Sequence, residues 1–241
     1  MIRTDRLAAA SRWKDKSLSE KAVTALGLMG LALALPPFPG ALAVLVAASL
    51  LAWRSGVGPA DWLALLAPPA AFIATGTVAL AVEIDAAGLH LAADGGRAGL
   101  AVALRALAAV AALLLLAATT PTPALIGGLR RLGLAPELAE VALAIYRFIF
   151  ILQDTAQTMH AVQAARLGTV GWRRRIRSAG LLAASLLPRA LDRAHRQEIG
   201  LAARGFDGSL RTLSAHRPVS VWGLARAAIL LVSIAGLGLA W

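Results

Sequence analysis

The chain has no cysteine and little charge or aromatic content, and these absences exclude several classes of protein. Without cysteine, its 241 residues cannot form a disulfide, a thiolate metal site or a cysteine nucleophile. Only 15% of its residues are charged, whereas an average soluble domain is about 25% charged. The sequence also has no Gly-rich phosphate-binding loop ending in Gly-Lys-Ser or Gly-Lys-Thr. We therefore do not expect the chain to hydrolyse ATP by itself.

Hydrophobic residues are abundant instead, and they are gathered in long segments with almost no charge. They make up 59% of the chain, and the mean hydropathy is +0.71. Such a distribution is typical of a chain that crosses a lipid bilayer several times. Five apolar segments follow one another, at 22–35, 41–53, 62–82, 100–118 and 219–241.

The first two segments are separated by the proline-rich stretch PPFPG at 36–40. Each is shorter than the roughly 20 residues needed to cross a bilayer upright, and proline breaks a regular helix. A helical hairpin with its turn at PPFPG is therefore predicted, and one long kinked helix is the alternative. Within 62–82 the pair Pro68-Pro69 is tolerated, because neighbouring helices satisfy the freed carbonyls. Arg105 lies near one end of its segment and is expected to snorkel to the interface.

The distribution of charge predicts the orientation of these segments. The net charge is +11, with six basic residues in 1–21 and 14 arginines against six acids in 119–218. The loop 83–99 is acidic. Because cytoplasmic loops are enriched in Lys and Arg, both basic regions are expected inside the cell and the acidic loop outside. Residues 138–152 are apolar, but basic sequence flanks both sides, so we expect a helix in the inner interface rather than a sixth span.

The sequence thus predicts an all-α polytopic membrane protein with about five transmembrane helices and two long cytoplasmic helices. Residues 1–21 are expected to form a cytoplasmic tail or surface helix. Residues 22–118 would hold the first four transmembrane helices. Residues 119–218 would hold a cytoplasmic or interfacial helical region, and 219–241 the last transmembrane helix.

The first long cytoplasmic helix is expected over 137–167. Its apolar residues recur at intervals of four and three, which is typical of a helix packing along another helix; they are Ile145, Ile149, Leu152, Ala156 and Met159. Gly168 is expected to provide the left-handed residue that ends the helix.

The second long helix is expected from near Trp172 to Arg204, with Gly205 ending it in the same way. Pro188 should kink it. Four arginines fall within about an 80° arc at 100° per residue and make one basic face; they are Arg189, Arg193, Arg196 and Arg204.

Both helices therefore end with Ala-Ala-Arg, at 164–166 and 202–204. Arginine near a helix C-terminus also interacts favourably with the helix dipole, by about 0.3–1 kcal/mol, so one such ending has an ordinary explanation. Two such endings on consecutive helices suggest docking, since a guanidinium binds carboxylates or exposed carbonyls of a partner.

The segments YRFIFILQDTAQTMHAVQAARLG at 146–168 and RSAGLLAASLLPRALDRAHRQEIGLAARGFDG at 177–208 resemble a known family. The chain resembles the transmembrane (T) component of energy-coupling factor transporters, most closely the CbiQ-type component of cobalt uptake systems. The resemblance is strongest over 140–210. That family has an Ala-Arg-Gly motif at the end of each of two coupling helices. Ala203-Arg204-Gly205 matches in full, whereas Ala165-Arg166-Leu167 departs at its third position.

The resemblance implies a non-catalytic subunit in the bacterial plasma membrane. Two ABC-type ATPase subunits would bind the two motifs in surface grooves, and the arginines would anchor them. Movement of the ATPases would then pass through the membrane helices to a separate substrate-binding membrane (S) component for cobalt(II). No cofactor is implied, and nickel or a vitamin is the alternative substrate within the same class.

Three other classes of function compete with this interpretation. A membrane-embedded enzyme would need clustered carboxylates or histidines, and a secondary transporter would need charges or inverted repeats inside the bilayer. The apolar segments contain few ionisable residues, chiefly Arg105 and Arg226. The basic 166–217 region could bind nucleic acid, but it has few aromatic residues for base stacking. Lipid phosphates or a partner protein therefore suit its arginines better. His90 and the acids of the outer loop match no compact set of metal ligands, and no metal site is expected.

Overall fold

A computed structural model describes residues 3–85, 88–91, 95–205 and 220–239, except for the side chains of 3, 81–85 and 88–91. The described residues are helical almost throughout, which confirms the predicted all-α class. The chain divides into two units, one comprising Met1–Gly128 with Ala215–Trp241 and the other Leu129–Ser214.

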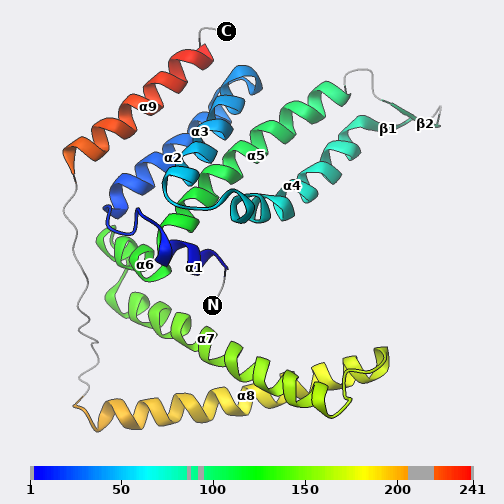
Figure 1. Cartoon of the computed structure of the whole chain (residues 1–241), viewed down its shortest axis with the longest axis vertical. Helices are drawn as coiled ribbons and strands as arrows, with labels where there is room; N and C mark the ends of the chain where they lie inside the picture. Colours follow the sequence, from blue (N-terminus) through cyan, green and yellow to red (C-terminus); the bar gives the residue numbers. More distant parts are fainter. Residues whose placement is uncertain (1–2, 86–87, 92–94, 206–219, 240–241) are drawn as a thin grey trace. The chain divides into compact units, whose positions relative to one another are not determined.

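The first unit is a bundle of helices (Figure 1). Four of its segments are long and apolar enough to cross a membrane: Pro37–Arg54, Pro59–Leu80, Gly95–Thr119 and Val221–Leu239. The helices are α1 (Arg3–Ala10), α2 (Leu18–Ala34), α3 (Leu42–Arg54), α4 (Pro59–Ala81), α5 (Gly95–Thr119), α6 (Thr122–Arg131) and α9 (Val221–Leu239). With 17 residues, α2 extends about 26 Å, slightly less than the roughly 30 Å of a bilayer core.

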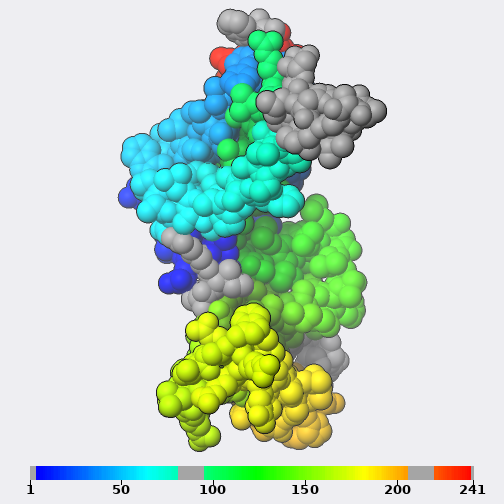
Figure 2. Space-filling view, turned by 90° about the vertical axis from the view of Figure 1, so that its right-hand side faces the viewer, coloured from blue at the N-terminus to red at the C-terminus, as the bar shows by residue number. Residues whose placement is uncertain are grey.

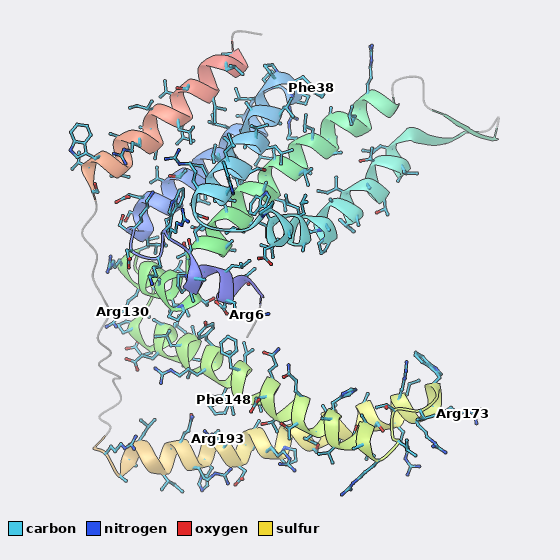
Figure 3. All side chains as sticks on the ribbon, viewed as in Figure 1. Arg6, Phe38, Arg130, Phe148, Arg173 and Arg193 are labelled. Atoms are coloured by element: carbon cyan, nitrogen blue, oxygen red, sulfur yellow. The ribbon has the colours of Figure 1, made fainter. Side chains whose placement is uncertain are left out.

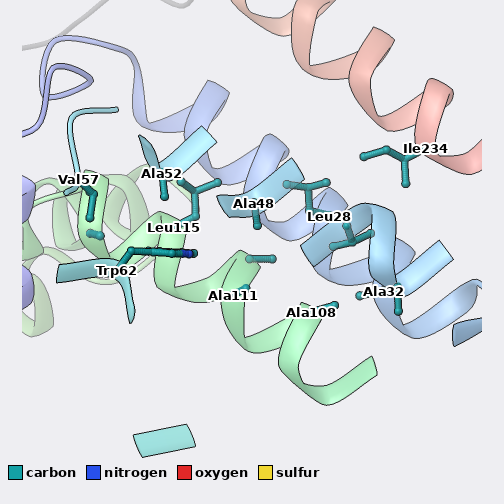
Figure 4. Packing of buried hydrophobic residues seen from close by; sticks show 14 of the residues in the cluster. Leu28, Ala32, Ala48, Ala52, Val57, Trp62, Ala108, Ala111, Leu115 and Ile234 are labelled. Atoms are coloured by element: carbon teal, nitrogen blue, oxygen red, sulfur yellow. The ribbon is translucent and has the colours of Figure 1, made fainter. Parts of the chain in front are cut away.

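Helix α5 lies at the centre of this bundle, and α1, α2, α3 and α4 all pack against it. One face of α5 is buried, and most of its side chains there are alanine (Figure 4). Small residues let helix backbones approach closely, which is how helices associate inside a membrane. The buried residues of this face are Ala108, Ala111, Ala112, Leu115 and Ala118.

Helices α2 and α3 form the predicted hairpin rather than one kinked helix, since each packs against the other and against α5. A short π-helical turn, η1 (Pro37–Ala41), connects them. Gly40 is required there, because a Cβ at this position would lie 2.5 Å from the Cβ of Leu35. That Arg105 reaches the bilayer interface stays a prediction. Its Nη2 donates a hydrogen bond to the carbonyl oxygen of Leu35 at 3.1 Å, which satisfies a carbonyl at the end of α2.

Helix α4 continues through Pro68 and Pro69 and lies on the surface of the first unit (Figure 2). Of the described side chains of α4 only Trp62, near its start, is buried in the protein, as expected for a helix that otherwise faces lipid. It crosses α5 where Gly99 lies so close to Thr77 that a Cβ would be 3.0 Å from the Thr77 oxygen. The predicted acidic loop contains a β hairpin that the sequence did not indicate. Its strands β1 (Val82–Asp85) and β2 (Gly88–Leu91) are antiparallel.

The N-terminal segment, expected as a tail or surface helix, is part of the bundle. Ala8 and Asp5 of α1 are buried. The Oδ1 atom of Asp5 accepts a hydrogen bond from the hydroxyl of Thr122 at 3.1 Å. The hydroxyl of Ser11 donates to the carbonyl oxygen of Ser55 at 3.0 Å. These bonds connect the segment to the end of α3 and the start of α6.

The second unit contains two long helices, α7 (Pro136–Ala165) and α8 (Trp172–Ala202), close to the predicted bounds. The apolar segment 138–152 lies inside α7, which is not among the four spanning candidates. The two helices contact each other, and the hydroxyl of Ser185 donates to the sulfur of Met159 at 3.7 Å. The first half of the predicted packing stripe is uncovered, since Ile145 is 55% exposed and Ile149 45%.

Candidate functional site

The end of α7 is a helix stop in which the left-handed residue is not a glycine. Leu167 adopts φ 58°, whereas Gly168 was predicted to take that role. The N–H of Gly168 donates to the carbonyl of Gln163 at 2.9 Å, and the N–H of Leu167 donates to that of Ala164 at 3.0 Å. This pair of bonds is a Schellman motif with Leu167 at its left-handed position.

Gly168 has a packing role instead. A Cβ at this position would lie 3.0 Å from both the carbonyl oxygen of Gln163 and the hydroxyl of Ser178. That hydroxyl donates to the carbonyl of Gly168 at 2.8 Å and so links the turn to α8. The predicted left-handed residue was therefore wrong by one position. Leu167 takes the left-handed conformation, and Gly168 allows the turn to pack against Ser178 of α8.

The end of α8 shares the left-handed residue and one of the two hydrogen bonds of this turn. Gly205 adopts φ 72°, as predicted, and its N–H donates to the carbonyl of Ala202 at 3.1 Å. Gly205 thus corresponds to Leu167, and Arg204 to Arg166. The substitution of Leu for Gly in the first motif leaves the left-handed turn in place.

Both motifs are on the protein surface. The side chains of Ala165, Arg166, Ala203 and Arg204 are exposed, as are Leu167 and Gly205. Among the described residues, neither guanidinium makes a hydrogen bond or an ion pair. Each arginine is therefore available to a partner.

The two motifs are not brought together in space. The turn after α7 adjoins the start of α8, and the second motif follows its end (Figure 1). Helix α8, which has 31 residues and is about 46 Å long at 1.5 Å per residue, lies between the two arginines in the chain. The second unit thus has an exposed arginine in the turn before α8 and another just after its end.

The predicted basic face lies on α8 between the motifs, where no residue is buried. Arg189 is exposed, and so is Arg193 (Figure 3). Arg196 forms an exposed ion pair with Asp192, one helical turn earlier. The face is therefore less basic than the arginines alone indicate.

Exposed apolar side chains lie in and just after the first motif. The sequence analysis included Leu167 in the motif but gave Val170 and Trp172 no binding role. Leu167 is 64% exposed, Val170 56% and Trp172 75%. An exposed tryptophan beside an exposed arginine is a common composition for a protein-binding surface. The signal was present in the sequence, since GTVGW directly follows the motif.

Among the described residues, no group of three or more His, Asp or Glu side chains could hold a metal ion. The hairpin pairs Glu83 with His90 in register, but the side chains of both, and all of Asp94, lie outside what the structure describes. The prediction about this loop therefore remains a prediction.

The chain is similar in sequence to a protein family and to several known proteins. The family model of the CbiQ cobalt transport protein matches residues 10–214. The chain is 43% identical over 217 residues to the cobalt transport protein CbiQ of Rhodobacter capsulatus, covering 90% of this chain and 89% of that one. It is 30% identical over 221 residues to CbiQ of Salmonella typhimurium, with 86% and 98% covered. It is also 27% identical over 106 residues to a putative fused cobalt transport protein CbiMQ of Methanocorpusculum labreanum, with 44% and 18% covered.

Proposed function

Because the chain belongs to the CbiQ family of cobalt transport proteins, we propose that it is the coupling subunit of an ATP-driven importer of cobalt(II). It would transmit the motion of partner ATPases through α7 and α8 to a separate membrane protein that binds the substrate. Its own role would be mechanical, since the sequence has no ATP-binding loop.

The pair of matching helix ends supports this proposal best. Arg166 and Arg204 each directly precede a residue in the left-handed conformation, with φ 58° at Leu167 and 72° at Gly205. Two like points on one rigid helix suit two copies of the same groove, as in a dimer of ATPase subunits. The arginines would bind carboxylates or carbonyls in those grooves by charge-assisted hydrogen bonds.

The absence of a buried core on α8 is consistent with such a role. A helix that transmits motion must be stiff along its length. It must also be able to exchange its contacts with neighbouring proteins. Helix α8 is continuous over 31 residues, and a continuous helix resists bending more than a loop does. Arg189, Arg193 and Arg196 would interact with the ATPases or with lipid phosphates.

The partner that binds the substrate is also a proposal. The relative named as a fused CbiMQ carries a CbiQ-like part within a longer chain. Such a fusion is consistent with two membrane components acting together. In this chain the second component would be a separate protein that contacts the bundle.

The proposed orientation places the N-terminus, α7 and α8 in the cytoplasm and the β hairpin outside the bacterial plasma membrane. In this arrangement 22–118 and 219–241 cross the bilayer, while 119–218 stays at the inner face. The distribution of arginines supports it by the positive-inside rule.

Co-purification in detergent with the candidate ATPase tests the proposal. The double variant Arg166→Glu, Arg204→Glu should lose the ATPase and abolish cobalt uptake by cells. The matched control is Arg130→Glu, Arg131→Glu, which reverses two exposed charges in the last turn of α6. The control should bind the ATPase as the unmodified chain does.

Two further results would contradict the proposal. Normal ATPase binding and uptake by the Arg166, Arg204 double variant would remove the docking role of both helix ends. Equal loss in the control would mean that binding depends on overall charge. Uptake of nickel in place of cobalt would leave the coupling mechanism intact and change the substrate.

A further inference from the structure

The first unit contains a cavity of about 720 Å³ that the proposed coupling role does not use. It lies where α2 and α9 begin and α3 ends, with residues of the α1–α2 loop on one side. Small-ligand sites in proteins are of the order of 300–1,000 Å³, so this volume suits a headgroup-sized ligand.

Glu20 forms the floor of the cavity and joins α2 to α9. Its Oε1 accepts hydrogen bonds from the hydroxyl of Ser17 and the backbone N–H of Ser220, both at 2.9 Å. Gly223 lies directly against this carboxylate, because a Cβ there would be 2.2 Å from Oε2. The floor is thus built from segments 200 residues apart, and its shape is set by direct contacts.

Basic side chains outnumber acidic ones around the cavity. Four cations line it, against the carboxylates of Asp15 and Glu20. Among the described residues, neither Arg54 nor Arg226 makes a hydrogen bond or an ion pair. The four cations are Lys16, Lys21, Arg54 and Arg226.

These cations are not equally free. The Nζ atom of Lys21 donates to the carbonyl of Thr119 at 2.9 Å. The ammonium of Lys16 lies 3.9 Å from the ring centre of Trp13. Burial lowers the pKa of Lys16, Glu20 opposes that change, and the charges of Arg226 and Arg54 lower it further. An anion between these groups would relieve their mutual repulsion.

The walls of the cavity indicate that it lies at a membrane surface. Leu51 and Leu230 line it from the apolar parts of α3 and α9. Trp222, 77% exposed, lines it at the start of α9, where tryptophan commonly marks the bilayer interface. Arg54 is the last residue of α3. A basic cavity with an apolar wall at this depth matches the headgroup and upper acyl chains of a phospholipid.

We propose that this cavity binds the headgroup of an anionic phospholipid, with Arg54 and Arg226 contacting the phosphate and Leu51 and Leu230 contacting the acyl chains. The bound lipid would join α2, α3 and α9 at their shared end. Trp13 and Trp222 would cover the headgroup from the aqueous side.

Native mass spectrometry of the delipidated full chain in detergent tests this site. The probes are dioleoyl phosphatidylglycerol and dioleoyl phosphatidylcholine, which have the same acyl chains and differ in net charge. The unmodified chain should retain one phosphatidylglycerol in preference to phosphatidylcholine. A basic residue near an anionic surface strengthens binding roughly fivefold, so Arg54→Gln, Arg226→Gln should weaken retention about 25-fold.

Two control variants separate the site from general charge and from folding. Arg6→Gln, Arg97→Gln removes two exposed charges elsewhere in the first unit and should retain the lipid. Arg54→Lys, Arg226→Lys keeps both charges and should retain most of it.

Three results would overturn the proposal. Equal retention of the two lipids would mean that the cavity does not select a net negative charge. Unchanged retention by Arg54→Gln, Arg226→Gln would place the lipid elsewhere. Displacement of the lipid by millimolar inorganic phosphate would make free phosphate, not lipid, the ligand.

Discussion

The two units differ most in how much they bury. In the first unit, α2, α3 and α5 share a continuous core of alanine and larger apolar residues. In the second, α7 buries only Ala139 among its described residues and α8 buries none. Burial is the main source of folding free energy, so the first unit can hold its own shape. The second buries little apolar surface of its own, which is consistent with the proposed role of a lever between other proteins.

The largest expected difference in stability between the two units comes from placing a larger side chain in the core of the first. Ala111 is fully buried on α5. The substitution Ala111→Phe should destabilise the protein by about 3 kcal/mol, because the larger side chain would force closely packed helices apart. The matched variant Ala183→Phe lies at an exposed position of α8. It should change the free energy of unfolding by less than about 0.5 kcal/mol. Denaturant unfolding in detergent micelles measures both, and equal losses would refute the contrast.

Substitutions of one acidic residue in each unit should differ in their stability cost by a smaller amount. Glu20 is 8% exposed and accepts two hydrogen bonds, so Glu20→Ala should cost about 2 kcal/mol. Glu198 on α8 has an 81% exposed side chain, and Glu198→Ala should have almost no effect. The same unfolding experiment compares them. A cost for Glu198→Ala similar to that of Glu20→Ala would show that α8 is packed more tightly than its exposure indicates.

The left-handed turn at Leu167 predicts a gain in stability within the second unit. The left-handed conformation costs a non-glycine residue about 1–2 kcal/mol, and glycine avoids this cost. Glycine in turn loses about 0.5–1 kcal/mol more chain entropy on folding, which offsets part of the gain. Leu167→Gly should therefore stabilise the turn by about 0.5–1 kcal/mol. Leu191→Gly, at an exposed position inside α8, should destabilise by about 1 kcal/mol. Hydrogen exchange of the amides at 163–170 reports the first effect; faster exchange there would contradict it.

The smallest expected effect belongs to the exposed pair Asp192–Arg196. Such pairs one helical turn apart contribute about 0.3–0.5 kcal/mol. A double-mutant cycle with Asp192→Ala and Arg196→Ala should give a coupling energy of that size, which should fade in 1 M salt. A coupling above about 1.5 kcal/mol would mean that α8 is shielded from water.

The sequence predicted the helices more accurately than their ends and contacts. Hydrophobic runs and arginine content indicated the spanning segments and the two long helices. The β hairpin at 82–91 was missed, because it lies in a polar loop without a strong strand pattern. The packing of α1 was missed because the segment 1–21 is mostly polar, and its buried atoms are satisfied by Thr122 and Ser55.

By itself, the sequence determined that the chain is helical in a membrane, since apolar segments of this length must satisfy their backbone groups internally. It also determined that two helices end in exposed arginines, because helix stops and dipoles act locally. Only the tertiary structure decided that Leu167 carries the left-handed turn and that Glu20 meets Ser220. Those features depend on contacts between distant parts of the chain, and local patterns do not encode such contacts.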